Sequence, residues 1–240
     1  MSKKYILCTL VMLVIYSCSE QNKIQDNFPK DSSISDIHGQ PKDSLTFYFP
    51  KTIRQDSQFI KVEMEDFMND WYSCNLHCFK EPILSNYYLG HDIYRFLWLR
   101  SFDRPVIFSL NKDENKVWLT IKILNKHPQV NEVKYFVPDL EHKYIIDSVV
   151  KADRQAILVY DETKYLTIKE WQEFEELLNN SLFWKSKPYQ FSIQIDGSDW
   201  TIESHLKNQY WFVNKNSPND SFKAAGVYLI NKSGLKESIY

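Results

Sequence analysis

Glycine is scarce in this chain of 240 residues. The five glycines are Gly39, Gly90, Gly197, Gly226 and Gly234, about 2% of the chain against an average near 7%. Because no two of them lie closer than eight residues in the sequence, the chain contains neither a P-loop nor the glycine-rich turn of a dinucleotide-binding fold. A large excess of one charge is missing as well. The formal net charge of −2 gives no indication of a nucleic-acid partner.

Long hydrophobic runs are also missing. The longest mostly apolar run, residues 5–16, would be about 18 Å long as a helix, too short for a hydrocarbon core of about 30 Å. Lys3 and Lys4 precede this run, and a basic start followed by a short apolar stretch is typical of a signal peptide. We therefore predict a signal peptide at residues 1–17.

Cysteine occurs at four positions, and one of them follows the apolar run directly. The residues Ile15-Tyr16-Ser17-Cys18 resemble the lipobox of bacterial lipoproteins. The resemblance implies a diacylglyceryl group and a further acyl chain such as palmitate on Cys18, and two or more chains anchor a protein stably. We predict a lipid-anchored protein of the bacterial cell envelope, on the outer membrane. The alternative is an ordinary cleaved signal peptide next to which Cys18 is incidental.

The polar stretch after Cys18 has isolated apolar residues at no regular period, together with Pro29, Gly39 and Pro41. Such a composition cannot bury enough apolar surface to offset the entropy of ordering the chain. We predict that residues 18–45 are a lipidated cysteine and flexible tether, and that residues 46–240 form a single globular domain.

Three segments show the periodicity of helices that bury one face. They are residues 63–79, 167–180 and 221–231. In the second segment, Thr167 and Glu170 are spaced as a capping box, in which each side chain accepts a hydrogen bond from the backbone of the other residue. This is the clearest element in the chain.

Apolar runs separated by polar turns predict strands and hairpins. One hairpin joins residues 106–110 to 117–124. A second joins residues 189–195 to 200–206 across Asp196-Gly197, because Asp-Gly is a strong signal for a two-residue turn. Strands joined by hairpins, with three or so packed helices, predict an α+β fold with a mostly antiparallel sheet. Further strands are expected at residues 94–100, 133–137, 145–150, 156–160 and 210–214.

Cys74, His77 and Cys78 lie within one helical turn and are three candidate zinc ligands. No second closely spaced pair completes four ligands, so we expect no metal and no cofactor. We interpret the two thiols as small core residues. Disulfide pairing or redox chemistry and metal binding remain alternatives, although a disulfide within one helical face would need distorted geometry.

Several charged residues gather around the strand at 94–100. If its leucine face is buried, Arg95 on that face needs a carboxylate partner, because an unpaired buried charge would cost several kcal/mol. Glu81 or Asp92 is the expected partner. A sharper alternative is an anion site built by Arg100 and Arg104.

Asp196, Ser198 and Asp199 place two carboxylates and a hydroxyl in one tight turn, which a hairpin alone explains. No GxSxG elbow accompanies them, and the histidines are scattered. The carboxylates and His205 therefore motivate a hydrolase only as an alternative. We expect no catalytic residues.

Four segments carry a wider resemblance. They are Glu-Pro-Ile-Leu at 81–84, Tyr-Arg-Phe-Leu-Trp-Leu-Arg-Ser-Phe at 94–102, Asp-Gly-Ser with Trp200 at 196–200, and Ser-Pro at 217–218. In these segments the chain resembles a group of uncharacterised lipoproteins of Bacteroidota, over roughly residues 60–230. The resemblance implies an envelope location and leaves the function open.

These observations predict a non-catalytic binding or scaffolding lipoprotein. Its expected partners are the membrane, through the lipid anchor, and an envelope protein or glycan. Alternatives are an envelope hydrolase near Asp196, Asp199 and His205, or an immunity-type protein that neutralises a toxin. The candidate ligand-binding residues are Arg100, Arg104, Trp200 and Trp211. Trp98 and Trp118 could also line a groove for a peptide or glycan, although most of these four tryptophans are expected to be core.

Overall fold

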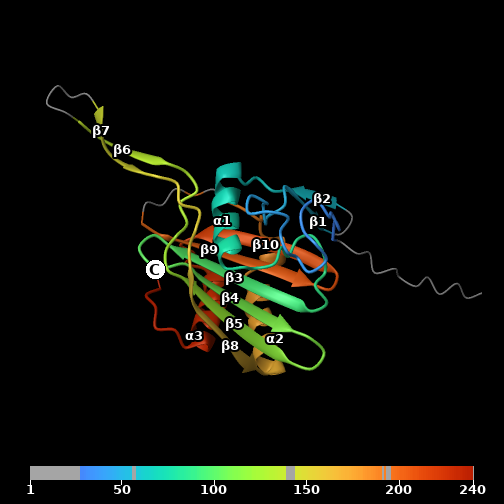
Figure 1. Ribbon diagram of the computed structural model, residues 1–240. Coiled ribbons are helices and arrows are strands. Elements are labelled where there is room, and N and C mark those ends of the chain that lie inside the picture. Colours follow the sequence, from blue (N-terminus) through green and yellow to red (C-terminus); the bar gives the residue numbers. More distant parts are fainter. Residues whose placement is uncertain (1–27, 56–57, 139–143, 191, 193–195, 240) are drawn as a thin grey trace, which may run out of the picture.

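The computed structural model describes residues 28–55, 58–138, 144–190, 192 and 196–239 and is built around a six-stranded antiparallel sheet (Figure 1). Helices pack on both faces of this sheet, which confirms the predicted α+β class. The signal peptide and Cys18 lie outside the described residues. The strand order is β10-β9-β3-β4-β5-β8, with β3 (Asp92–Arg100), β4 (Val106–Lys112), β5 (Val117–Leu124), β8 (Leu158–Leu166), β9 (Ser198–Leu206) and β10 (Gln209–Asn216).

Helix α2 (Ile168–Asn180) covers one face of the sheet and begins as the sequence predicts. The Thr167 hydroxyl accepts a hydrogen bond from the backbone N–H of Glu170 at 3.2 Å, and the Glu170 carboxylate accepts one from the backbone N–H of Thr167 at 2.8 Å. One turn into the helix, buried Trp171 packs against Tyr94 of β3, with ring centres 4.9 Å apart. The capping box therefore defines where α2 begins, and the packing of Trp171 on Tyr94 holds the helix against β3.

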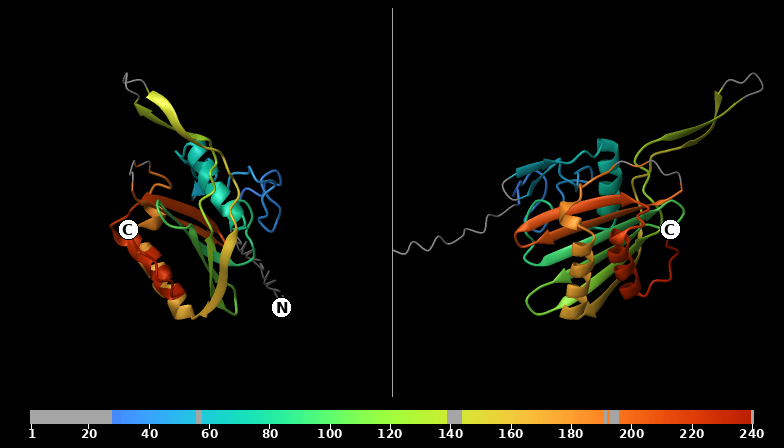
Figure 2. Two further views of the ribbon diagram at one scale, coloured as in Figure 1. Left: turned by 60° about the vertical axis from the view of Figure 1, so that its left-hand side comes forward. Right: turned by 180° about the vertical axis from the view of Figure 1, so that it is seen from behind.

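Helix α3 (Ser221–Ser233) lies beside α2 on the same face of the sheet (Figure 2). Gly234, whose left-handed backbone suits the residue after a helix, ends it three residues beyond the predicted segment. A Cβ atom on Gly226 would lie 2.4 Å from the ring of Trp200. Glycine at this position therefore lets the helix backbone rest directly on a tryptophan of β9.

Helix α1 (Asp66–Cys78) covers part of the opposite face together with the N-terminal segment (Figure 2). Its Tyr72 hydroxyl donates to Asp199 of β9 at 3.2 Å and accepts from Asn214 of β10 at 3.3 Å. The helix is thereby held over the β9–β10 side of the sheet, and the chain leaves it toward β4 and β5.

The flexible tether that we predicted up to residue 45 is wrong for residues 28–45. Phe28 is buried, with its ring 4.8 Å from that of His205. The buried side chain of Asn86 accepts a hydrogen bond from the backbone of Asp31 and donates one back to it, both at 2.7 Å. The segment needs no core of its own, because it packs on a surface that the rest of the domain provides.

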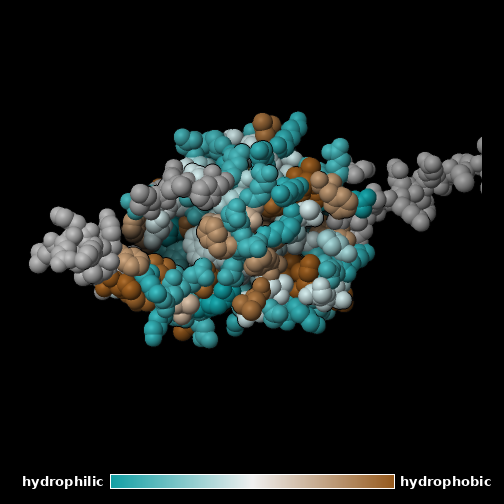
Figure 3. Space-filling model, turned by 90° about the horizontal axis from the view of Figure 1, so that it is seen from above, coloured by the Kyte–Doolittle hydropathy of each residue, from teal (hydrophilic) through white to brown (hydrophobic). Residues whose placement is uncertain are grey.

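A two-stranded arm of β6 (Val133–Pro138) and β7 (Tyr144–Val150) projects from the body (Figure 1). Phe136, Val137 and Ile146 on it are exposed, and hydrophobic side chains gather there on the space-filling surface (Figure 3). The remaining small elements are the hairpin of β1 (Thr52–Gln55) and β2 (Gln58–Lys61) and the 3₁₀ helix η1 (Phe183–Lys185).

The hairpin predicted across Asp196-Gly197 is wrong. Its predicted first arm, residues 189–195, lies mostly outside the described residues, and strand β9 instead pairs with β3 on one side and with β10 on the other. Gly197 lacks the left-handed backbone that the predicted turn requires. The hairpin of β9 instead turns at Lys207-Asn208. Strand β8 also extends beyond the predicted run of residues 156–160.

Candidate functional site

The sheet face toward α1 is only partly covered, and the uncovered part forms a groove over β4 and β5. Along β5, buried residues alternate with the half-buried Trp118, Thr120 and Lys122. Their register partners on β8, Tyr165 and Thr163 among them, are exposed. This period of two shows that one face of β5 and β8 lies in the core and the other faces the groove.

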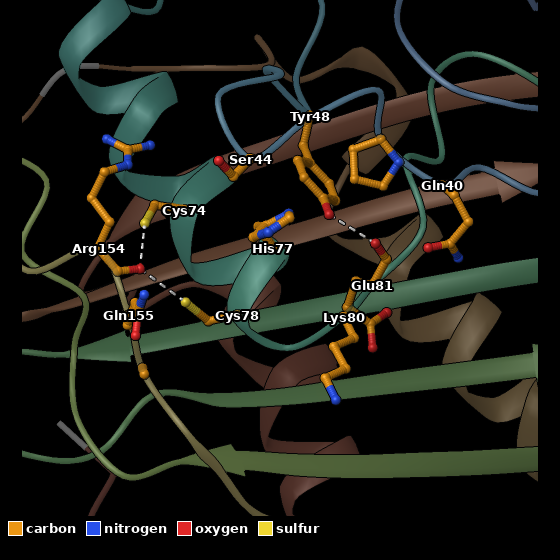
Figure 4. A pocket seen from close by; sticks show the side chains of 12 residues that line it. Gln40, Ser44, Tyr48, Cys74, His77, Cys78, Lys80, Glu81, Arg154 and Gln155 are labelled. Carbon is orange, nitrogen blue, oxygen red and sulfur yellow. Dashed lines mark hydrogen bonds between the residues drawn. The ribbon is translucent and has the colours of Figure 1, made fainter.

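Two adjoining cavities make up the groove, and they share the lining residues Gln40 and Glu81. The sheet cavity, of about 340 Å³, lies over β3, β4 and β5. The thiol cavity, of about 540 Å³, lies between the end of α1, the N-terminal segment and residues 154–156 (Figure 4). The groove therefore runs from the sheet to the last turn of α1.

Trp118 forms an aromatic wall of the sheet cavity. Its ring centre lies 5.3 Å from that of His91, and the ammonium of Lys116 lies 4.9 Å from the ring centre. His91 also contacts the side chain of Asn111 at 3.3 Å, and Thr120 lines the same cavity. An apolar ring beside amide, hydroxyl and imidazole groups suits a ligand that has both an apolar face and hydrogen-bonding groups.

Glu81 lies at the junction of the two cavities because of the way α1 ends. The backbone N–H of Glu81 bonds the carbonyl of Leu76, and that of Lys80 bonds the carbonyl of His77. This is the Schellman pattern, in which the residue after the helix is usually a left-handed glycine. Lys80 takes that conformation here, with φ of 56°. The turn directs the chain, and with it Glu81, toward β4 and β5.

Buried charges form a hydrogen-bonded network under the groove. The Glu81 carboxylate accepts from Lys122 Nζ at 2.8 Å and lies 3.6 Å from Arg95 Nη1. Arg95, fully buried, donates two hydrogen bonds to Glu203 and one to the carbonyl of Pro82 at 2.7 Å. The network thus contains two cations and two carboxylates, and its charges balance.

The network confirms Glu81, one of the two expected alternatives, as a partner of Arg95. Glu81 is close to Arg95 as predicted, whereas Asp92 pairs with Lys112 at 3.7 Å. Glu203, which sequence reasoning missed, is the principal partner. Burial raises the pKa of Glu203, and Arg95 opposes that rise. Burial acts to lower the pKa of Arg95, but the two carboxylates outweigh it and raise that pKa.

The thiol cavity contains the cysteines that the sequence singles out. Cys74 is buried, as predicted, and Cys78 is partly exposed; both are free. Both thiols donate to the carbonyl oxygen of Arg154, and their mutual interaction raises the pKa of Cys74 and lowers that of Cys78 to about 7. Among the described residues, no three His, Cys, Asp or Glu side chains stand close enough to hold a metal ion.

The alternative of an anion site at Arg100 and Arg104 is wrong for Arg100, which is already paired within the chain. Arg100 is buried on the α2–α3 side, 4.0 Å from the ring centre of Trp98, and donates to Glu237 at 2.9 Å. Its guanidinium is therefore neutralised by the chain's own carboxylate. Arg104 is exposed, and its backbone carbonyl accepts a hydrogen bond from Arg100 at 3.3 Å.

The predicted tryptophan binding residues are mostly core. Trp200 is fully buried beneath Gly226, and Trp98 is buried beside it. Trp211 is 2% exposed and borders a separate cavity of about 270 Å³ near η1. Of the four tryptophans named from the sequence, Trp118 is the one that lines the groove.

The residues of the hydrolase alternative do not meet. Asp199 and His205 lie six residues apart on β9, which separates them by about 20 Å. Asp199 is engaged by Tyr72, and burial raises its pKa. His205 donates to the carbonyl of Leu84 at 2.7 Å, and burial lowers its pKa to about 4. Asp196 is exposed at a bend before β9.

Comparisons with protein-family models, with curated proteins and with solved structures find no match. The resemblance to lipoproteins of Bacteroidota stays a prediction. Within the described residues, none of the helices is long and apolar enough to span a membrane.

Proposed function

We propose that the protein is a lipid-anchored lipoprotein of the cell envelope that binds a neutral oligosaccharide in the groove without catalysing a reaction. The observation that carries the proposal is the half-buried Trp118 in the wall of the sheet cavity, beside His91 and Asn111. An aromatic ring offers an apolar surface to one face of a sugar, while neighbouring polar groups bond its hydroxyls.

The charges under the groove favour a neutral ligand. Lys122 and Arg95 share Glu81, and Arg95 is also paired with Glu203. A charged ligand would have to displace one of these partners and leave another charge buried without compensation, at a cost of several kcal/mol. Uncharged hydroxyl groups can bond to Thr120, which lines the groove, and leave the ion pairs in place.

We propose binding without catalysis because the acid–base residues singled out from the sequence do not form a site. Asp199 and His205 are far apart along β9, and each is already hydrogen-bonded within the fold. With its residues separated, the hydrolase alternative loses the observation that motivated it.

The binding proposal is tested with uncharged hexasaccharides of glucose and N-acetylglucosamine, titrated calorimetrically against the purified full chain. We expect Trp118→Ala to weaken binding by about tenfold, which corresponds to about 1.4 kcal/mol. The matched control is Trp184→Ala, which removes a partly buried tryptophan from η1. Equal affinities of wild type and Trp118→Ala, or a preference for sulfated over neutral sugars, would contradict the proposal.

The anchor is tested separately at Cys18. Cys18→Ala removes the only sulfur at the lipobox position, so we expect the variant to move from the detergent phase to the aqueous phase of a cell extract. Cys8→Ala, which changes a cysteine within the apolar run, is the control. Retention of Cys18→Ala in the detergent phase would disprove lipidation at this residue without affecting the oligosaccharide proposal.

A further inference from the structure

Two thiols one helical turn apart share one hydrogen-bond acceptor at the end of α1. Sγ of Cys74 lies 3.4 Å from the carbonyl oxygen of Arg154, and Sγ of Cys78 lies 3.3 Å from the same oxygen (Figure 4). A common acceptor keeps the two sulfurs near each other. Cys74 is 2% exposed, whereas Cys78 is partly exposed, and both sulfurs border the thiol cavity.

The surroundings of Cys78 offer donors to a thiolate. Once Cys78 has lost its proton, the S–H of Cys74 can turn from the Arg154 carbonyl toward Sγ of Cys78. This S–H and the backbone N–H of Ala156 stabilise the charged form of Cys78, and the Arg154 guanidinium acts in the same direction. These contributions outweigh burial and lower the pKa of Cys78 to about 7. At neutral pH a large share of Cys78 is therefore the nucleophilic thiolate.

The other charged groups around the two thiols are largely paired among themselves. Arg154 donates two hydrogen bonds to Asp70 at 2.7 and 2.8 Å. Asp153, which opposes ionisation of Cys78, is paired with Lys126. His77, Lys80 and Glu81 line the same cavity. The environment of Cys78 is therefore set mainly by its hydrogen bonds.

We propose that Cys78 is a modification site that captures small-molecule disulfides as mixed disulfides, and that Cys74 is the positioning residue whose S–H holds the attacking thiolate. Sγ of Cys78, after its proton has passed to water, attacks one sulfur of a disulfide RS–SR. A new S–S bond forms to Cys78 as the original S–S bond breaks, and RS⁻ leaves. The cavity of about 540 Å³ lies within the size range of small-molecule sites. This site does not depend on the oligosaccharide proposal.

The attachment site is tested by incubating the full chain with glutathione disulfide at pH 7. Intact mass and peptide mapping then assign the adduct to Cys78, to Cys74 or to another cysteine of the purified protein. We expect one glutathione on Cys78, none in Cys78→Ser, and an unchanged adduct in Cys74→Ser. Mapping of the wild type needs no variant to fold. An adduct mainly on Cys74, or an internal disulfide in place of a stable adduct, would overturn the proposal.

The role of Cys74 is tested by the pH dependence of the reaction with 5,5′-dithiobis(2-nitrobenzoic acid). In Cys74→Ala we expect the midpoint to move from about 7 toward the ordinary thiol value of about 8.5. The rate at pH 7 should then fall about threefold, because the smaller thiolate fraction is partly offset by a more nucleophilic sulfur. Cys74→Ser keeps a donor and should keep the low midpoint. If wild type and urea-unfolded chain share one midpoint, the fold does not activate Cys78.

Discussion

The two faces of the central sheet are made by the same strands but are held by different interactions. Strand β3 directs Tyr94 and Phe96 to the side of α2 and α3, where they pack against aromatic rings. The same strand directs Arg95 to the groove side, where it meets Glu203 and Glu81. Around β3, the α2–α3 face is therefore packed with aromatic rings, whereas the groove face adds a buried network of ion pairs to its apolar packing. The groove lies over the second face.

The largest loss of stability is expected for a substitution that leaves a cavity on the α2–α3 face of the sheet. Trp171→Ala removes a fully buried indole that packs on Tyr94, and we expect a loss of about 3–5 kcal/mol in the free energy of unfolding. Urea unfolding followed by circular dichroism measures this loss. Trp184→Ala, which removes a partly buried ring, is the control. A loss below about 1 kcal/mol for Trp171→Ala would mean that this face is not core.

Breaking the ion pair between Arg95 and Glu203 should cost about as much stability. Removing both charges together should recover most of that loss. Glu203→Leu leaves the buried Arg95 without its principal partner, and we expect a loss of about 3–5 kcal/mol. Arg95→Met combined with Glu203→Leu removes both charges, and it should recover most of that stability. The double-mutant cycle in urea distinguishes the two faces. If the double variant is less stable than Glu203→Leu, the ion pair contributes more than the packing that replaces it.

Lowering the pH should reduce the free energy of unfolding, because His205 on the groove side of the sheet is buried in its neutral form. Burial lowers the pKa of His205 to about 4, below its ordinary value of about 6.5. Between these values the unfolded chain binds a proton that the folded chain does not, so stability falls as the pH falls, by up to about 3 kcal/mol. Above pH 6.5 both states are neutral and the effect vanishes. The measurement is unfolding free energy between pH 7.5 and 4.5, with His205→Gln as the comparison. Equal slopes for the two proteins would show that His205 does not control this dependence.

The smallest effect concerns the end of α1. Lys80 has a left-handed backbone, with φ of 56°, at the position of a helix-ending motif that glycine usually occupies. Lys80→Gly removes that strain, and we expect a gain of about 0.5–1 kcal/mol. Lys42→Gly, at an ordinary loop position in the N-terminal segment, is the control. A loss of stability in Lys80→Gly would mean that the lysine side chain supports the groove.

The sequence predicted the elements whose signals are local. The capping box of Thr167 and Glu170, and the apolar stripe after it, lie within one helix, so α2 could be placed before the structure was known. The helix ending at Gly234 and the hairpin of β4 and β5 are local in the same sense. In contrast, the Arg95–Glu203 pair joins residues 108 positions apart. Nothing in the order of residues says which distant carboxylate will lie opposite a buried arginine.

The candidate site shows the same limit. A tryptophan in a strand fits a binding surface and a core equally well, and Trp200 lies in the core because Gly226 of α3 rests on it. The position of Trp118 could be predicted better. It lies between Val117 and Leu119 in β5, where it shares a strand face with Thr120 and Lys122, and this alternation indicates the less buried face of the sheet. The packing of residues 28–45 could not be predicted, because the surface that holds them is assembled from distant segments.

The attachment of the β6–β7 arm has a consequence for the thiol cavity. Its base is fastened to the body where Gln129 and Asp153 exchange backbone hydrogen bonds, and where Arg154 is bound to Asp70 of α1. The base of the arm therefore meets α1 at Arg154 in two ways. Its guanidinium binds Asp70, and its carbonyl oxygen accepts hydrogen bonds from Cys74 and Cys78, so the arm and the wall of the thiol cavity share one attachment to the helix.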